Sequence, residues 1–265
     1  MHPAIEIVSH CYAGSVPVYR QHLRFQIASL RKYPVRELVR LTVFATAADE
    51  GTVNMVQNMI PQMPDHVVIR LIQLPPEKLF RRSIGRNQVA LEGDASIYWF
   101  TDCDYFFGQG CLDSVLDNMD AHSGLCYPAM VHINTTHEDG DAMIESSLKR
   151  GLLFPNIEPG RFTERRQRTC IGGVHIIGRD RLRTINPKTR TAYGYNNGSR
   201  RYQSEVDPAG GFCQCRGDVP FKKNMGPAQA LPIRNTFRIR HSDAGRCFDD
   251  QGNRTVERKA GQTHD

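Results

Sequence analysis

The chain has 265 residues, of which 40% are hydrophobic and 23% charged. This composition is typical of a globular protein and excludes a long disordered chain or a small disulfide scaffold. No run of residues approaches the roughly 18–20 apolar positions that a membrane span needs, and residues 1–7 lack a signal-peptide pattern. We therefore expect a soluble, cytoplasmic protein. The eight cysteines form no C-x-x-C pair, which argues against a zinc ribbon and a secreted framework.

Positive charge is concentrated in one part of the chain. Residues 161–201 hold eleven lysines and arginines against two acids, although the net charge of the whole chain is only +6. A local excess of this kind predicts a surface that meets an anionic ligand, such as a phosphorylated molecule or nucleic acid. A basic face that contacts only solvent is the alternative.

The first hundred residues alternate β-branched runs with amphipathic helical patterns. Strands are predicted at residues 5–8, 38–45, 67–72 and 95–100, and helices at 18–32, 53–60 and 82–92. This alternation is typical of βαβ units. It predicts an α/β fold with a mixed, mostly parallel central sheet flanked by helices.

The elements become more widely spaced after residue 110. Helices are predicted at 112–119 and 141–149, and strands at 125–133, 170–177 and 236–241. The chain is expected to become loop-rich and basic after residue 149. We expect a single domain over residues 1–246, followed by a polar tail at 247–265.

Two acidic residues follow the apolar strand at 95–100. In open α/β sheets ligands bind beyond the carboxyl ends of the strands, so the loops at 9–14, 46–50 and 101–105 should converge. Asp102 and Asp104 would then lie at a binding edge, where two carboxylates one residue apart can reach the same Mg²⁺ or Mn²⁺. A D-x-D sequence alone also occurs in many surface turns.

The run GRNQVALEGD at residues 85–94, followed by IYWFTDCD at 97–104, resembles the central block of family 2 glycosyltransferases with the GT-A fold. Weaker matches extend the resemblance over residues 5–241. The resemblance implies a GT-A fold with a nucleotide-sugar half at 1–110 and an acceptor half at 111–246. It also implies inverting transfer of a sugar from a nucleotide-diphosphate sugar, with a UDP-sugar favoured, to an acceptor hydroxyl.

The same resemblance assigns a metal site. Asp102 and Asp104 look like the D-x-D pair that holds Mn²⁺ or Mg²⁺ against the phosphates of the donor. His241 resembles a C-terminal histidine that adds a further metal contact, although a lone histidine is more often structural or exposed to solvent.

Four residues resemble the donor-binding positions of the family. Arg86 would lie near the donor, unless it is a solvated helix arginine paired with a nearby acid. Ser9 and Tyr12 would begin the nucleotide pocket, although the sequence there departs from the usual Pro-x-Tyr-Asn. Asp49 could contact the base or ribose, or could cap a helix.

The acceptor side is represented by an acidic pair and a diglycine. Glu205 and Asp207 resemble the family's catalytic base element, with Glu205 narrowly preferred, but they could equally be solvated acids that balance neighbouring arginines. Gly172 and Gly173 resemble acceptor-side glycines, with an ordinary tight turn as the alternative.

The acceptor is expected to be a glycan or a polyanion, including hydroxymethylated DNA of the phage type, for which the basic segment 161–201 would supply contacts. Two other functions remain open. One is a nucleotidyltransferase, although no glycine-rich phosphate loop follows the first strand. The other is a non-catalytic nucleic-acid-binding protein, which only the basic segment supports.

Overall fold

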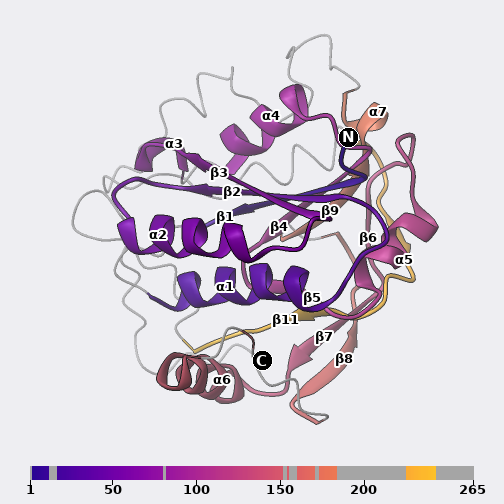
Figure 1. Cartoon of the computed structure of the whole chain (residues 1–265). Coiled ribbons are helices and arrows are strands. Elements are labelled where there is room, and N and C mark those ends of the chain that lie inside the picture. Colours follow the sequence, from indigo (N-terminus) through magenta and orange to yellow (C-terminus); the bar gives the residue numbers. More distant parts are fainter. Residues whose placement is uncertain are drawn as a thin grey trace, which may run out of the picture.

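A parallel sheet with helices on both faces forms the first half of the fold (Figure 1). The computed structural model describes residues 2–11, 17–79, 82–151, 154, 160–170, 173–183 and 225–242. Its first elements are β1 (Ile5–His10), α1 (Pro17–Lys32), β2 (Val39–Ala45), α2 (Glu50–Met59), a 3₁₀ turn η1 (Ile60–Gln62), β3 (Val67–Gln73), α3 (Pro76–Leu79), α4 (Arg82–Glu92) and β4 (Ile97–Asp102). Helices α1 and α2 lie on one side of the sheet, and α3 and α4 on the other.

The second half adds strands to this sheet and builds a smaller one. Its elements are β5 (Tyr105–Phe107), α5 (Cys111–Asn118), β6 (Cys126–Pro128), β7 (Met130–Asn134), α6 (His137–Arg150), β8 (Phe162–Arg166), β9 (Val174–Gly178), α7 (Arg179–Leu182), β10 (Gln229–Leu231) and β11 (Thr236–Arg238). None of the helices in the described ranges is long and apolar enough to cross a membrane.

Seven of the described strands form the main sheet, in the order β10-β6-β9-β4-β1-β2-β3. All neighbouring pairs are parallel except those of β9, which runs antiparallel to both β4 and β6. The predicted α/β fold with a mixed, mostly parallel sheet is therefore confirmed.

The smaller sheet has the order β5-β11-β7-β8. It was not anticipated, because the apolar run at 125–133 reads as one strand. In the structure that run divides after Pro128, so that β6 joins the main sheet and β7 the smaller one. Strand β8 lies in the segment that was expected to be loop, since four of its five residues are exposed and show no apolar alternation.

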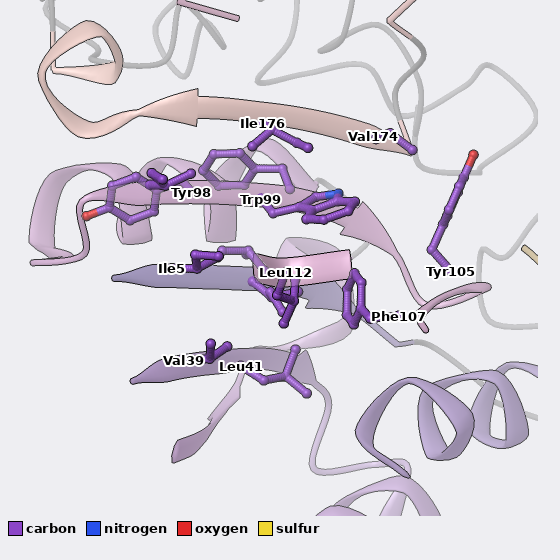
Figure 2. Close-up of a cluster of buried hydrophobic side chains, with 14 of the residues drawn as sticks. Ile5, Val39, Leu41, Tyr98, Trp99, Tyr105, Phe107, Leu112, Val174 and Ile176 are labelled. Carbon is purple, nitrogen blue, oxygen red and sulfur yellow. The ribbon is translucent and has the colours of Figure 1, made fainter. Parts of the chain in front are cut away.

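Large buried aromatic side chains surround β4, at the centre of the main sheet. Tyr98, Trp99 and Phe100 are fully buried, and Figure 2 shows Tyr98 and Trp99 packed beneath the β9 residue Ile176. The Trp99 ring meets Phe107 edge to face, with 5.0 Å between ring centroids. Burial of this much aromatic surface fixes β4 and therefore the position of the residues that end it.

The strand register brings the predicted loops to one edge. His10 at the end of β1 is level with Phe44 of β2 and with Asp102 of β4. The carboxyl ends of these three strands therefore meet, as expected, within the described residues. Strand β4 continues to Asp102 itself, two residues beyond the predicted end.

Candidate functional site

Asp102 and Asp104 lie at the carboxyl edge of the main sheet. Asp102 is the last residue of β4, and Asp104 stands in the tight turn that leads into β5. The Asp102 side chain is one third exposed, whereas that of Asp104 is 17% exposed. The two carboxylates are thus held by a rigid strand end and are reachable from solvent.

Two arginines of helix α4 face Asp102. Arg82 and Arg86 are four residues apart and therefore lie on the same side of the helix. The Arg82 Nη1 forms an ion pair with Asp102 Oδ1, and Arg86 Nη2 lies 3.9 Å from the same oxygen. Burial alone would raise the pKa of Asp102, but the charges of Arg82 and Arg86 lower that pKa to about 2. Asp102 is therefore an anion at neutral pH.

Arg86 itself is fully buried. Its guanidinium lies 5.8 Å from the centre of the Phe100 ring, a separation typical of a cation–π contact. The alternative of a solvated helix arginine is therefore wrong.

A third arginine reaches Asp104 from the smaller sheet. Arg238 of β11 donates from Nε to Asp104 Oδ2 at 2.8 Å, and its guanidinium lies 5.2 Å from the centre of the Tyr105 ring. The other carboxylate oxygen, Asp104 Oδ1, is buried and has no hydrogen-bond partner. Burial raises the pKa of Asp104, while Arg238 acts to lower it.

The two carboxylates fit a divalent cation in the type and position of their oxygens. A buried carboxylate oxygen without a partner is a group that a hard cation would satisfy, and Mg²⁺ is commonly held by one or two carboxylates together with substrate phosphates. The described part of the chain contains no group of three acidic, histidine or cysteine side chains placed to ligate one ion. Asp102 and Asp104 would therefore hold the ion together with ligands from outside these residues.

Gly173 is pressed against Asp102. Its carbonyl oxygen accepts a hydrogen bond from the Asp102 amide at 3.2 Å, and a Cβ at this position would lie 2.9 Å from Asp102 Oδ2. The glycine is thus required by the close approach to a carboxylate. Gly172 lies outside the described residues.

We expect Gly173→Ala to move the Asp102 carboxylate and to reduce catalysis more than stability. Overpacking should cost about 1–3 kcal/mol in the free energy of unfolding, while a displacement of the order of 1 Å in a catalytic group can lower turnover about a hundredfold. Turnover and thermal unfolding should be measured together. Gly124→Ala is the matched control, because no atom lies within 4 Å of its added Cβ. Unchanged turnover in Gly173→Ala would contradict the close fit.

His10 is a buried residue at the end of β1, next to Ser9. Its ring stacks on Phe44 with 4.7 Å between centroids, and neither ring nitrogen has a hydrogen-bond partner among the described residues. Burial, together with Arg86 and Arg82, holds the pKa of His10 well below its usual value, so the ring is neutral. The α4 residue Gly85 makes this packing possible, since a Cβ there would lie 2.6 Å from His10 Nε2.

Ser9 supports the site from inside the fold. It is fully buried, and its hydroxyl donates to Gln26 Oε1 at 2.7 Å. Gln26 Nε2 in turn donates to the carbonyl oxygen of Tyr105 at 2.9 Å. Ser9 therefore helps to hold the turn that carries the two aspartates, and Tyr12 lies outside the described residues.

Asp49 adopts the capping role. Its carboxylate accepts hydrogen bonds from the Thr52 amide at 3.1 Å and the Thr52 hydroxyl at 2.6 Å, at the start of α2. Arg20 also donates to it at 2.7 Å. These contacts occupy both carboxylate oxygens, so the helix-cap alternative is the one that the structure shows.

His241 lies near the aspartates in an aromatic cluster. It is 5% exposed, and its ring centroid lies 5.2 Å from that of His22 and 5.6 Å from that of Tyr19. Burial and the neighbouring His241 lower the pKa of His22 to about 3. This packing is a structural role, and His241 does not form a group of three metal ligands with Asp102 and Asp104 in the described residues. The proposed bases Glu205 and Asp207 lie outside the described residues.

No protein-family model and no curated protein matches the chain. Solved structures do resemble it at low identity. A mannosyltransferase from Pyrobaculum calidifontis, solved with GDP-Man and Mn²⁺, is 13% identical over 90% of this chain, with a TM-score of 0.46. The galactosyltransferase LgtC, solved with donor and acceptor sugar analogues, is 14% identical over 68% of it, with a TM-score of 0.40.

The mouse xyloside xylosyltransferase 1 is 9% identical over 68% of each chain, with a TM-score of 0.40. The chain spans 57% of the mannosyltransferase and 60% of LgtC. Similarity at this level assigns no residue role. All three of these structures are glycosyltransferases.

Proposed function

We propose that this protein is a glycosyltransferase of the GT-A type that uses a nucleotide-diphosphate sugar. The observation that carries the proposal is the pair Asp102 and Asp104 at the ligand-binding edge, faced by two arginines of helix α4 and one of the smaller sheet. Cleavage of a sugar–diphosphate bond leaves negative charge on the diphosphate. A site that combines guanidinium groups with carboxylates for a cation is suited to stabilise that charge.

The arginines would bind and orient the diphosphate. Arg86 is buried and held against Phe100, so its guanidinium keeps one orientation. Arg82 and Arg238 are held by the carboxylates of Asp102 and Asp104. Arg86 is thus fixed before the donor binds and need not reorganise when charge develops, which favours electrostatic catalysis, whereas Arg82 and Arg238 would have to leave their carboxylates.

Asp102 and Asp104 would hold Mn²⁺ or Mg²⁺. His241 is proposed as a further ligand, which requires it to move toward the aspartates, because the three side chains do not form a ligand group in the described residues. Such an ion acts as a Lewis acid that stabilises the departing diphosphate. Arg82 and Arg238 now occupy the oxygens that a cation would use. We therefore expect both guanidinium groups to turn from the carboxylates to the phosphates when cation and donor are bound.

An inverting transfer needs one base for the acceptor hydroxyl, and we propose Glu205 or Asp207 for this role. A UDP-sugar is the favoured donor and a glycan or polyanion the proposed acceptor. Ser9 and Asp49 would act on the donor pocket indirectly, through the turn at 102–105 and the start of α2.

Release of nucleoside diphosphate from a panel of sugar nucleotides tests the proposal without a known acceptor. The purified chain should release the diphosphate from one donor in the presence of Mn²⁺ or Mg²⁺, and EDTA should abolish the release. Donor-induced thermal stabilisation provides an independent measure of binding. No release and no stabilisation across the panel would overturn the glycosyltransferase assignment, and release of pyrophosphate from nucleoside triphosphates would favour a nucleotidyltransferase.

A further inference from the structure

A basic hollow lies beside strand β8, at the outer edge of the smaller sheet. It has a volume of about 630 Å³ and is lined by residues of β6, β8, β10 and the segments that follow β6 and β8: Tyr127, Ala129, Arg165, Arg166, Gln167, Arg168 and Ala230. We call it the β8 hollow. The proposed donor site does not include any of these residues. Figure 1 shows β8 outermost in its sheet, next to β7.

The β8 hollow is strongly positive. Three of its seven lining residues are arginines and none is acidic. Arg165, Arg166 and Arg168 are all exposed, and none of them forms an ion pair with any residue in the part of the chain that the structure describes. Two other exposed arginines, Arg36 and Arg234, are paired with a carboxylate, that of Asp117. Three guanidinium groups without a carboxylate partner, in a single hollow, indicate a site for an anionic ligand.

The backbone around the hollow is fixed rather than a free loop. The Gln167 amide donates to the carbonyl oxygen of Ala129 at 2.9 Å, and the Ala129 amide donates to that of Leu231 at 2.7 Å. These bonds tie the arginine segment to the junction of the two sheets. The side-chain amide nitrogen of Gln167 is also buried in this lining without a hydrogen-bond acceptor. A buried donor without a partner is a group that a bound oxyanion would satisfy.

Basic side chains connect the hollow to the aspartate site. Arg165 of β8 is level with Val131 of the neighbouring strand β7, and Arg238 of β11 is level with Ile133 on the other side of β7. Within the smaller sheet, only β7 therefore separates the hollow from the arginine that contacts Asp104. A chain with phosphates along its length would meet positive charge from β8 to the proposed donor site.

We propose that the β8 hollow binds a phosphodiester-linked polyol or sugar chain, and that this chain is the acceptor of the transferase. The acceptor role rests on the proposed function. The hollow is within the size range of pockets that take small ligands, and it can hold one or a few repeating units. Arginine suits phosphate oxygens by its forked geometry. Tyr127 is 7% exposed, so the hollow offers no open aromatic face for a base to stack on, which disfavours a nucleic acid.

The test measures binding of three labelled probes to the full chain by fluorescence anisotropy. The probes are a poly(glycerol phosphate) oligomer, a thymidine oligonucleotide with the same number of phosphates, and a neutral dextran. We expect the wild type to bind the poly(glycerol phosphate) oligomer, with an affinity that falls as salt rises. The variant R165Q/R166Q/R168Q should bind it about a hundredfold more weakly, because charge-assisted hydrogen bonds are lost. Arg150→Gln is the control, since Arg150 is exposed on α6 and outside the hollow.

Each result bears on a separate part of the proposal. Equal binding by the triple variant and the wild type would overturn the site, as would binding of dextran alone. If the oligonucleotide binds more tightly than the poly(glycerol phosphate) oligomer, and the triple variant loses this binding, the ligand of the hollow is a nucleic acid and the polyol phosphate is overturned. The triple variant should retain donor release, because the aspartate site is intact. The wild type could instead bind the polyanion but release no nucleoside diphosphate from any donor. That result would support the binding site in the hollow and overturn its role in glycosyl transfer.

Discussion

Asp104→Asn should lower donor turnover by about a thousandfold while the protein remains folded. The substitution keeps the shape of the side chain but removes its negative charge and one of the two carboxylates that would hold the cation. Loss of a single group that stabilises developing charge commonly lowers kcat by roughly 10²–10³-fold, and the cation adds a further contribution. Nucleoside diphosphate release from the accepted donor is the measurement. Asp65→Asn is the control, because Asp65 is exposed in the turn before β3, at the amino end of that strand.

A second variant separates catalysis from stability. In Asp104→Asn the Arg238 guanidinium loses its 2.8 Å partner, which could destabilise the protein by itself. The double variant Asp104→Asn/Arg238→Gln removes both charges and should recover thermal stability toward that of the wild type. We expect its turnover to remain as low as that of the single variant or lower. Recovery of turnover in the double variant would show that the carboxylate only neutralises Arg238.

Gly140→Ala should destabilise the protein more than any other glycine substitution described above. Gly140 lies in α6, and a Cβ there would overlap the carbonyl oxygen of Arg240 and lie 2.7 Å from Nδ2 of Asn134. The obstructing atoms are mostly backbone, so no side-chain rotation can relieve the overlap. We expect a loss of about 3 kcal/mol in the free energy of unfolding. This corresponds to a fall in Tm of roughly 6–12 °C, measured by thermal denaturation.

The same substitution should affect the segment that ends in His241. Asn134 accepts a hydrogen bond from the Arg240 amide at 2.7 Å and donates to the Arg240 carbonyl oxygen at 2.8 Å. In Gly140→Ala, either helix α6 must move away from Arg240, or the two hydrogen bonds between Asn134 and Arg240 must break. Gly124→Ala, with nothing near its added Cβ, should change Tm by no more than a degree or two. A Gly140→Ala protein as stable as that control would mean that α6 is less closely packed than described.

The sequence predicts those parts of the fold whose signal is local. Helix α4 begins and ends at the predicted residues 82 and 92. Asp102 and Asp104 could be placed at a binding edge because an apolar strand precedes them directly. The division of residues 125–133 between two sheets was missed because the run was taken as one strand, although Pro128 lies at the break and a proline commonly interrupts a strand.

The partners of the two aspartates show the same limit. Arg82 could have been found, because it stands one helical turn before Arg86 and so shares its face. Arg238 gives no such signal. It reaches Asp104 only because β11 pairs antiparallel with β5, a contact between residues more than 120 positions apart. The sequence likewise does not show why a glycine is needed at position 173. The carboxylate that a Cβ there would approach belongs to Asp102, which lies on another strand.

The reversed direction of β9 determines which kinds of connection can shape the binding edge. In a fully parallel sheet every loop at the carboxyl edge leaves a strand and runs toward a helix. Because β9 is antiparallel to β4, the residue that precedes β9 meets the end of β4, and Gly173 bonds to Asp102 for this reason. A loop that enters a strand thus contributes to this edge. Its length and sequence can vary without altering any strand-to-helix loop, so evolution could change the ligand that is recognised there while the arginine and aspartate framework stays in place.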